Sequence, residues 1–231
     1  MAERDEVLRD EAADAYARLY GRALPPAARP ARDLAKASGD PTRVIYAPTA
    51  FTRPEGTSSF NAFELGTFTL ERGLTSNLTI GLQTAVPIGA FVIGPTVRLG
   101  APFEGGAVGL QLNALMFVPF VGHSDAVLIA GGGPILTLGN YDQYFNVGAL
   151  GYVTTAKAPG VIIPHAGFSV RASSSIRVGA EFYLPGAYGS DVRDGGLGKV
   201  GIAVWGFRLI GDRFWGDIAF VDLICDGCGD L

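Results

Sequence analysis

Apolar and polar residues alternate along most of this chain. Between Asn77 and Gln83, apolar residues occupy the even positions and small or polar residues the odd ones. From Phe91 to Gly100 the alternation continues, with most of the apolar residues at odd positions. A period of two is typical of a β-strand with two unlike faces. These two segments therefore predict neighbouring strands that share one continuous apolar face.

The same pattern predicts eleven strands after the first 42 residues. Their expected ranges are 43–52, 59–72, 77–87, 90–99, 106–118, 126–138, 143–154, 161–171, 175–185, 198–209 and 213–223. Most span ten residues or more, whereas strands average about five or six residues and a tilted strand crosses a bilayer with about 9 to 11. Because single-chain bacterial barrels have even strand numbers, we expect ten or twelve. The sequence favours an all-β, up-and-down antiparallel transmembrane-type barrel.

The connections between the predicted strands fall into two groups. Those at one end are mostly short, such as 73–76 and 139–142, whereas those at the other end are Pro-rich and include the long segment 186–197. Short turns at one end and longer loops at the other are typical of an outer-membrane barrel.

Composition agrees with a single large β-domain that is poor in surface charge. Of the 231 residues, 48% are hydrophobic and only 17% charged, against about 25% charged in soluble domains. The net charge of -4 and the lack of clustered Lys and Arg argue against a nucleic-acid partner. No uncharged apolar run reaches the roughly 18 residues of a membrane-spanning helix.

The two faces of the predicted strands suit different environments. The polar face is small and sparsely charged, which suits a crowded lumen and leaves the other face to hydrocarbon. The predicted lumenal residues are Thr79, Gln83, Thr96, Arg98, Gln111, Asn113, Asn146, His165, Ser169, Arg171, Arg177 and Glu181. The residues predicted to face lipid are Leu78, Ile80, Phe91, Ile93, Leu110, Leu112, Leu128, Ile162, Phe168, Val178, Phe182, Val200 and Ile202.

The expected organisation has three parts. Residues 1–42 hold many of the charges and predict a short amphipathic helix over 5–20, followed by a Pro-rich linker. Residues 43–224 form the barrel, and residues 225–231 form a Cys-containing tail. The first residues, Met1 to Arg9, are too charged for a secretory signal. We expect either a cytoplasmic chain or, preferably, a mature form whose signal peptide has been removed.

Five residues are candidates for a lumenal polar cluster, namely His165, Ser169, Arg171, Arg177 and Glu181. A tight turn that sets Arg171 opposite Ser175 would place Ser169 opposite Arg177 and His165 opposite Glu181. Such a cluster either gates a pore or simply pairs buried charges, and the second interpretation is favoured because buried charges need partners whatever the function. A hydrolase that uses His165 and Ser169 is a weaker hypothesis.

Two further motifs carry little chemistry. Cys225 and Cys228 predict a local disulfide, with free thiols next, because no helix follows and the His residues are too distant to complete a zinc site. The run Gly131-Gly132-Gly133-Pro134 is a crowded strand rather than a phosphate loop, since no Lys-Ser/Thr follows it. We expect no metal and no cofactor.

Several short segments resemble uncharacterised bacterial outer-membrane β-barrel proteins known only by their barrel. The resemblance rests on the runs 46–50, 64–66, 72–81 and 200–217, and it implies a fold and a location without catalytic residues. The ending Cys228-Gly229-Asp230-Leu231 departs from the terminal aromatic strand of such barrels.

The sequence thus predicts a non-enzymatic outer-membrane protein in contact with lipids, with a structural or narrow porin-like role. The alternative is a soluble or periplasmic barrel or sandwich that turns its apolar face inward around an apolar ligand.

Overall fold

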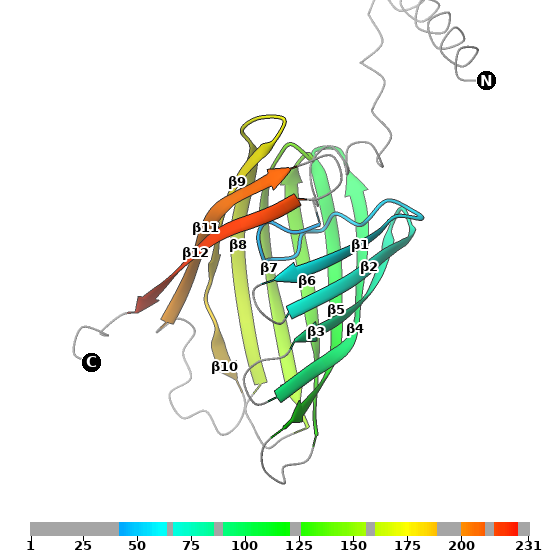
Figure 1. The fold of residues 1–231 in the computed structure, drawn as a ribbon, viewed down its shortest axis with the longest axis vertical. Coiled ribbons are helices and arrows are strands. Elements are labelled where there is room, and N and C mark those ends of the chain that lie inside the picture. The colour runs from blue at the N-terminus through cyan, green and yellow to red at the C-terminus, as the bar shows by residue number, and fades with distance from the viewer. Residues whose placement is uncertain are drawn as a thin grey trace, which may run out of the picture.

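The described part of the chain is a single antiparallel β-sheet in an up-and-down arrangement (Figure 1). The computed structural model describes residues 42–63, 67–85, 90–120, 126–155, 160–188, 200–210 and 215–225. The predicted all-β class is therefore confirmed for these ranges. The helix and linker predicted for residues 1–42 lie outside them, apart from Thr42. Within the same ranges, no helix has the length and apolar character needed to cross a membrane.

Most of the observed strands are long and match the predicted ranges within a few residues. They are β1 (Ser58–Phe63), β2 (Thr67–Thr75), β3 (Leu78–Ala85), β4 (Ala90–Phe103), β5 (Gly106–Pro119), β6 (Val127–Gly139), β7 (Gln143–Thr154), β8 (Gly160–Arg171), β9 (Ile176–Tyr183), β10 (Gly186–Tyr188), β11 (Val200–Ile210) and β12 (Trp215–Cys225). Two predictions are wrong. The range 59–72 is divided between β1 and β2, and the range 43–52 is not a strand of the sheet.

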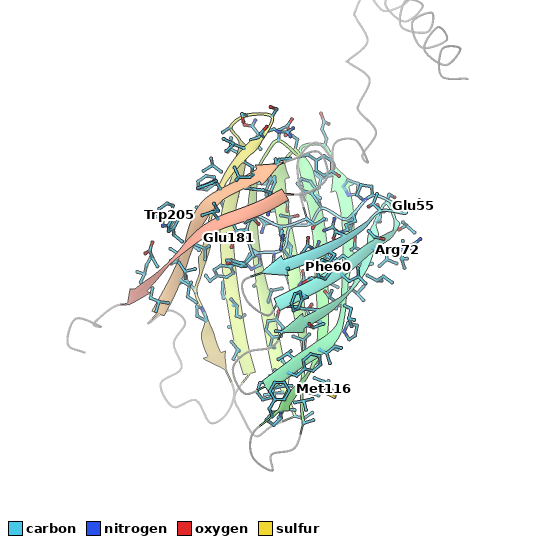
Figure 2. All side chains as sticks on the ribbon, in the orientation of Figure 1. Glu55, Phe60, Arg72, Met116, Glu181 and Trp205 are labelled. Carbon is cyan, nitrogen blue, oxygen red and sulfur yellow. The ribbon has the colours of Figure 1, made fainter. Side chains whose placement is uncertain are left out.

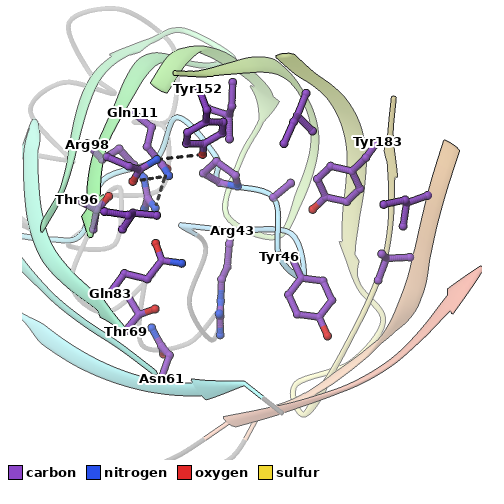
Figure 3. Close-up of a pocket in the computed structure, with 18 of the residues that line it drawn as sticks. Arg43, Tyr46, Asn61, Thr69, Gln83, Thr96, Arg98, Gln111, Tyr152 and Tyr183 are labelled. Atoms are coloured by element: carbon purple, nitrogen blue, oxygen red, sulfur yellow. Dashed lines mark hydrogen bonds between the residues drawn. The ribbon is translucent and has the colours of Figure 1, made fainter. Parts of the chain in front are cut away.

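Eleven strands make up the continuous path, which runs from β1 to β9 and then through β11 to β12. The short strand β10 lies off this path and pairs with β8, so the expected even number, ten or twelve, is met only when β10 is counted as the twelfth strand. An odd path makes β1 and β12 run in the same direction. Among the described residues no hydrogen-bonded pairing joins these two strands, and the sheet curves so that they form its two edges (Figures 1 and 3).

The faces of the sheet are arranged as the alternation predicts, with apolar residues outside and polar residues inside. Leu112 is 46% exposed and Phe168 47%, whereas Asn146 is 0% exposed and Glu181 3%. Figure 2 shows Phe60, Met116 and Trp205 on the outside of the sheet. Residues two apart in a strand share a face. Assigning one residue of a strand to the inner or outer face therefore assigns all the others.

The prediction for Ile202 is wrong. In β11, apolar residues occupy both faces, so alternation alone does not identify the inner one. The inner face is fixed by Val204 and Arg208, which are 3% and 2% exposed, and Ile202 shares their parity. Ile202 therefore points inward, while the side chain of Val200 is not described.

The predicted short turns at one end are present. β4 and β5 are joined through Glu104 and Gly105 alone, and Gly105 adopts a φ of 87°, which favours glycine. The turns 140–142 and 172–175 lie at the same end of the sheet.

Candidate functional site in the lumen

Residues 42–53, named the lumenal segment below, lie inside the curved sheet rather than within it. Figure 3 shows Arg43 and Tyr46 of this segment surrounded by the strands. The segment bends back on itself, because the N–H of Val44 donates to the carbonyl of Ala47 (3.0 Å) and that of Thr49 to the carbonyl of Thr42 (2.9 Å). Most of its side chains are buried. It occupies the lumen at the end of the short turns.

Glu181 of β9 anchors the bend of the lumenal segment. Its Oε1 atom accepts hydrogen bonds from the backbone N–H groups of Ile45, Tyr46 (2.8 Å) and Ala47 (2.8 Å). The hydroxyl of Tyr183 donates to Oε2 at 2.6 Å. One buried carboxylate thereby accepts hydrogen bonds from three consecutive N–H groups of the bend, which is the role a charged acceptor fills best.

Polar side chains from other strands complete the attachment. Thr137 accepts a hydrogen bond from the N–H of Ala50 (2.8 Å) and donates to Oδ1 of Asn146 (2.8 Å). Asn146 in turn donates to the carbonyl of Pro48 (2.9 Å). Similar bonds join Tyr144 to the carbonyl of Arg43 (2.8 Å), Arg208 to the carbonyl of Val44 (3.0 Å) and Thr79 to the N–H of Arg53 (2.8 Å). The inward polar residues thus serve as partners for an irregular backbone.

A small apolar cluster also holds the lumenal segment. Val44, Ile45 and Phe51 pack with buried residues of the strands. The ring of Phe51 lies 4.8 Å from that of Tyr141 and meets that of Tyr144 edge-on at 5.6 Å. Burial raises the pKa of the Tyr141 phenol in the 140–142 turn, so this ring stays neutral at ordinary pH.

Two carboxylates each lie between two arginines. Glu71 pairs with Arg53 at 2.9 Å and with Arg98 at 3.4 Å. In the second group, Asp217 pairs with Arg208 at 2.6 Å and with Arg43 at 3.9 Å. In each group one arginine is held closely and the other loosely.

A cavity of about 590 Å³, named the chamber below, lies next to the lumenal segment (Figure 3). The loosely held arginines of both groups, Arg43 and Arg98, line it. Its polar wall comes from β1 to β5 and β7, and contains Asn61, Thr69, Glu71, Gln83, Thr96, Gln111, Asn113 and Tyr152. Its apolar wall contains Leu115, Leu150, Ile163, Ile202, Val204 and Val221. The volume is within the usual range for small-molecule sites.

The register between β8 and β9 differs from the prediction by two residues. Arg171 is opposite Arg177, Gly167 is opposite Glu181, and His165 is opposite Tyr183. Five residues rather than three separate Arg171 from its cross-strand partner, and a shift of two leaves every side chain on its predicted face. The predicted inward face of these residues was therefore correct, and their predicted cross-strand pairs were wrong.

The five residues of the predicted polar cluster do not form one group. Arg177 donates to Oγ of Ser169 (3.0 Å) and to the carbonyl of Tyr141. Arg171 binds Asp142 at 3.3 Å, at the partly exposed rim. His165 is buried, with its ring 6.1 Å from that of Tyr183, and in the described part of the chain no hydrogen bond joins it to Glu181 or Ser169.

Sequence reasoning missed the lumenal segment and its partners Tyr144, Thr137 and Arg208. Val44, Ile45 and Tyr46 have the residue types of a strand, which concealed the irregular backbone. A signal for the second charged group was present, because Arg208 and Asp217 are directly opposite in the β11–β12 hairpin. Opposite charges at paired positions of a predicted hairpin indicate a contact.

The remaining candidate motifs are only partly described. Cys225 ends β12, but its side chain and the whole of Cys228 lie outside the described residues, so the disulfide stays a prediction. Gly131 to Gly133 lie within β6, as expected of a crowded strand. Across the described ranges, no group of three or more His, Cys, Asp and Glu residues is placed to hold a metal ion.

Comparisons with protein-family models, with curated proteins and with solved structures found no match for this chain.

Proposed function

We propose that this protein is a transmembrane β-barrel protein of a bacterial outer membrane, with a narrow lumen that the lumenal segment closes at the end of the short turns. The role is structural or that of a narrow, gated pore. The observation that carries the proposal is the inverted polarity of the sheet, with apolar side chains outside and polar ones buried.

In water this arrangement is unfavourable. A soluble monomer rarely exposes a contiguous apolar surface larger than a few hundred Å², yet exposed Leu, Ile, Val and Phe side chains occur on strands all along this sheet. In the described strands, the only charged residues on the outer face are Arg72 and Asp222. Hydrocarbon on the outside accounts for both features.

The strand lengths support the same conclusion. β4 and β5 have 14 residues each, and β7 and β8 have 12, which is enough to cross a bilayer at a tilt. The alternative of an apolar ligand bound by an inward apolar face requires the opposite orientation of these side chains. A hydrolase is not favoured either, because the hydroxyl of Ser169 accepts its hydrogen bond from Arg177.

Purification and electrophoresis test the proposal. The protein should need detergent to stay dispersed, and it should migrate differently on gels before and after heating, as a folded membrane barrel does. A monodisperse protein obtained from buffer without detergent would refute the membrane location.

A further inference from the structure

Arg98 is a buried cation with an incomplete set of partners. Its side chain lines the chamber, and the residue is only 6% exposed. Its Nη2 atom lies 3.4 Å from oxygens of Glu71 and Gln111, which are long distances for charge-assisted bonds. Nε and Nη1 have no hydrogen-bond partner among the described residues. A buried guanidinium in this condition is costly unless an anion or water completes its contacts.

The neighbouring carboxylate does not neutralise Arg98 fully. The other oxygen of Glu71 accepts a closer bond from Arg53, at 2.9 Å. Glu71 therefore divides its negative charge between two arginines, Arg53 and Arg98, and the more distant of the two is Arg98. Each arginine that lines the chamber, Arg43 or Arg98, shares its carboxylate with a second arginine that lies closer to it.

The opposite wall of the chamber favours an apolar group. Leu115, Leu150 and Ile163 project inward from β5, β7 and β8, and Ile202, Val204 and Val221 do so from β11 and β12. They lie beside one another in the lining of the chamber, away from the polar side chains of β1 to β4. The chamber thus has a cationic, amide-rich side and an aliphatic side within one space of about 590 Å³.

We propose that the chamber binds an amphiphile with one carboxylate headgroup and an aliphatic tail of medium length, the chemical class of the fatty acids. The carboxylate lies against the guanidinium of Arg98 and the amides of Gln111 and Asn113. The tail lies along the apolar wall. A free small anion would use only the first side of the chamber, and a neutral hydrocarbon only the second.

Octanoate is the probe that tests this inference. Saturable binding of radiolabelled octanoate is measured on the full chain in a non-ionic detergent, after heat-modifiable mobility has established that each variant is folded. Octanol, which lacks the charge, and acetate, which lacks the tail, are the competitors. Each should compete at least about tenfold more weakly than unlabelled octanoate, since a charge-assisted bond or a buried tail is worth more than 1.4 kcal/mol.

The variants locate the headgroup and the tail. Arg98→Gln should weaken octanoate binding at least about tenfold, and Ile163→Trp should weaken it by filling the apolar side. Arg72→Gln removes an exposed arginine of β2 and should bind as the wild type does. The competition on the wild-type chain needs no variant, so it decides the matter even where Arg98→Gln fails to fold.

Three results would overturn the inference: no saturable binding by the wild type, octanol competing as well as octanoate, or a folded Arg98→Gln variant with unchanged affinity. A protein that needs detergent but binds no octanoate would keep the proposed function and lose this inference. A protein that purifies from buffer and still binds octanoate would do the reverse.

Discussion

Glu181 accepts a hydrogen bond of 2.8 Å from the backbone N–H of Ala47, although 134 positions separate the two residues in the sequence. The same carboxylate oxygen serves the N–H groups of Ile45 and Tyr46. A side chain of β9 therefore holds the bend of the lumenal segment, and a charged acceptor makes these bonds stronger than a neutral one would.

Glu181→Gln should loosen the lumenal segment. The amide keeps one oxygen but loses the charge that strengthens the bonds from the three N–H groups, and the expected loss is about 1–3 kcal/mol. In planar bilayers, the variant should show larger or more frequent conductance steps than the wild type. Glu55→Gln, at an exposed carboxylate near the start of β1 (Figure 2), is the matched control and should leave conductance unchanged. Equal conductance in all three proteins would exclude a gating role for this attachment.

Arg177→Ala should lower stability. Truncation removes the donor to Ser169 and to the carbonyl of Tyr141, as well as the cation that lies 5.4 Å from the ring centre of Tyr144. Buried acceptors left without donors cost about 1–3 kcal/mol each. The temperature at which the folded gel band converts to the unfolded one should fall, whereas Arg72→Ala, which removes an exposed arginine, should change it little. An unaltered conversion temperature for Arg177→Ala would argue against the structural role of this residue.

Gly133→Ala should impair folding. A Cβ atom at this position of β6 would collide with the backbone carbonyl of Ala149 on β7, which cannot move as a flexible side chain can. Overpacking of this kind costs about 1–3 kcal/mol or more. Gly216→Ala is the control, because nothing lies within 4 Å of a Cβ at that position. Refolding yield into detergent distinguishes the two variants, and equal yields would show that the strand spacing adapts.

Leu112→Arg separates a membrane environment from an aqueous one. Leu112 lies near the middle of β5 and is 46% exposed on the outer face. An arginine at the midplane of a bilayer costs about 2–4 kcal/mol, and less near the interface. Insertion into lipid vesicles should therefore fall for Leu112→Arg and change less for Leu74→Arg, since Leu74 lies at the turn end of β2. If Leu112→Arg inserts as well as the wild type, the outer face does not meet hydrocarbon there.

The sequence by itself determined the strands and the faces of most of them. Alternation is a local property, because successive side chains of an extended backbone point in opposite directions whatever the neighbouring strand is. The faces of residues Asn77 to Gln83 could therefore be predicted without knowing the neighbouring strand. As expected, Thr79 is buried while Ile80 and Leu82 are exposed. The same local property left β11 undecided, since both of its faces are apolar.

The tertiary structure alone decided which groups meet inside the sheet. The cross-strand partners of Arg171 and Glu181 depend on the length of one turn, which alternation does not fix, and so the predicted pairs were displaced by two residues. The path of residues 43–52 depends on acceptors that lie in strands more than 80 positions away, such as Thr137 and Glu181. Those residues have the composition of a strand, but the curved sheet surrounds them with polar side chains, and the backbone bonds to these instead of to a neighbouring strand.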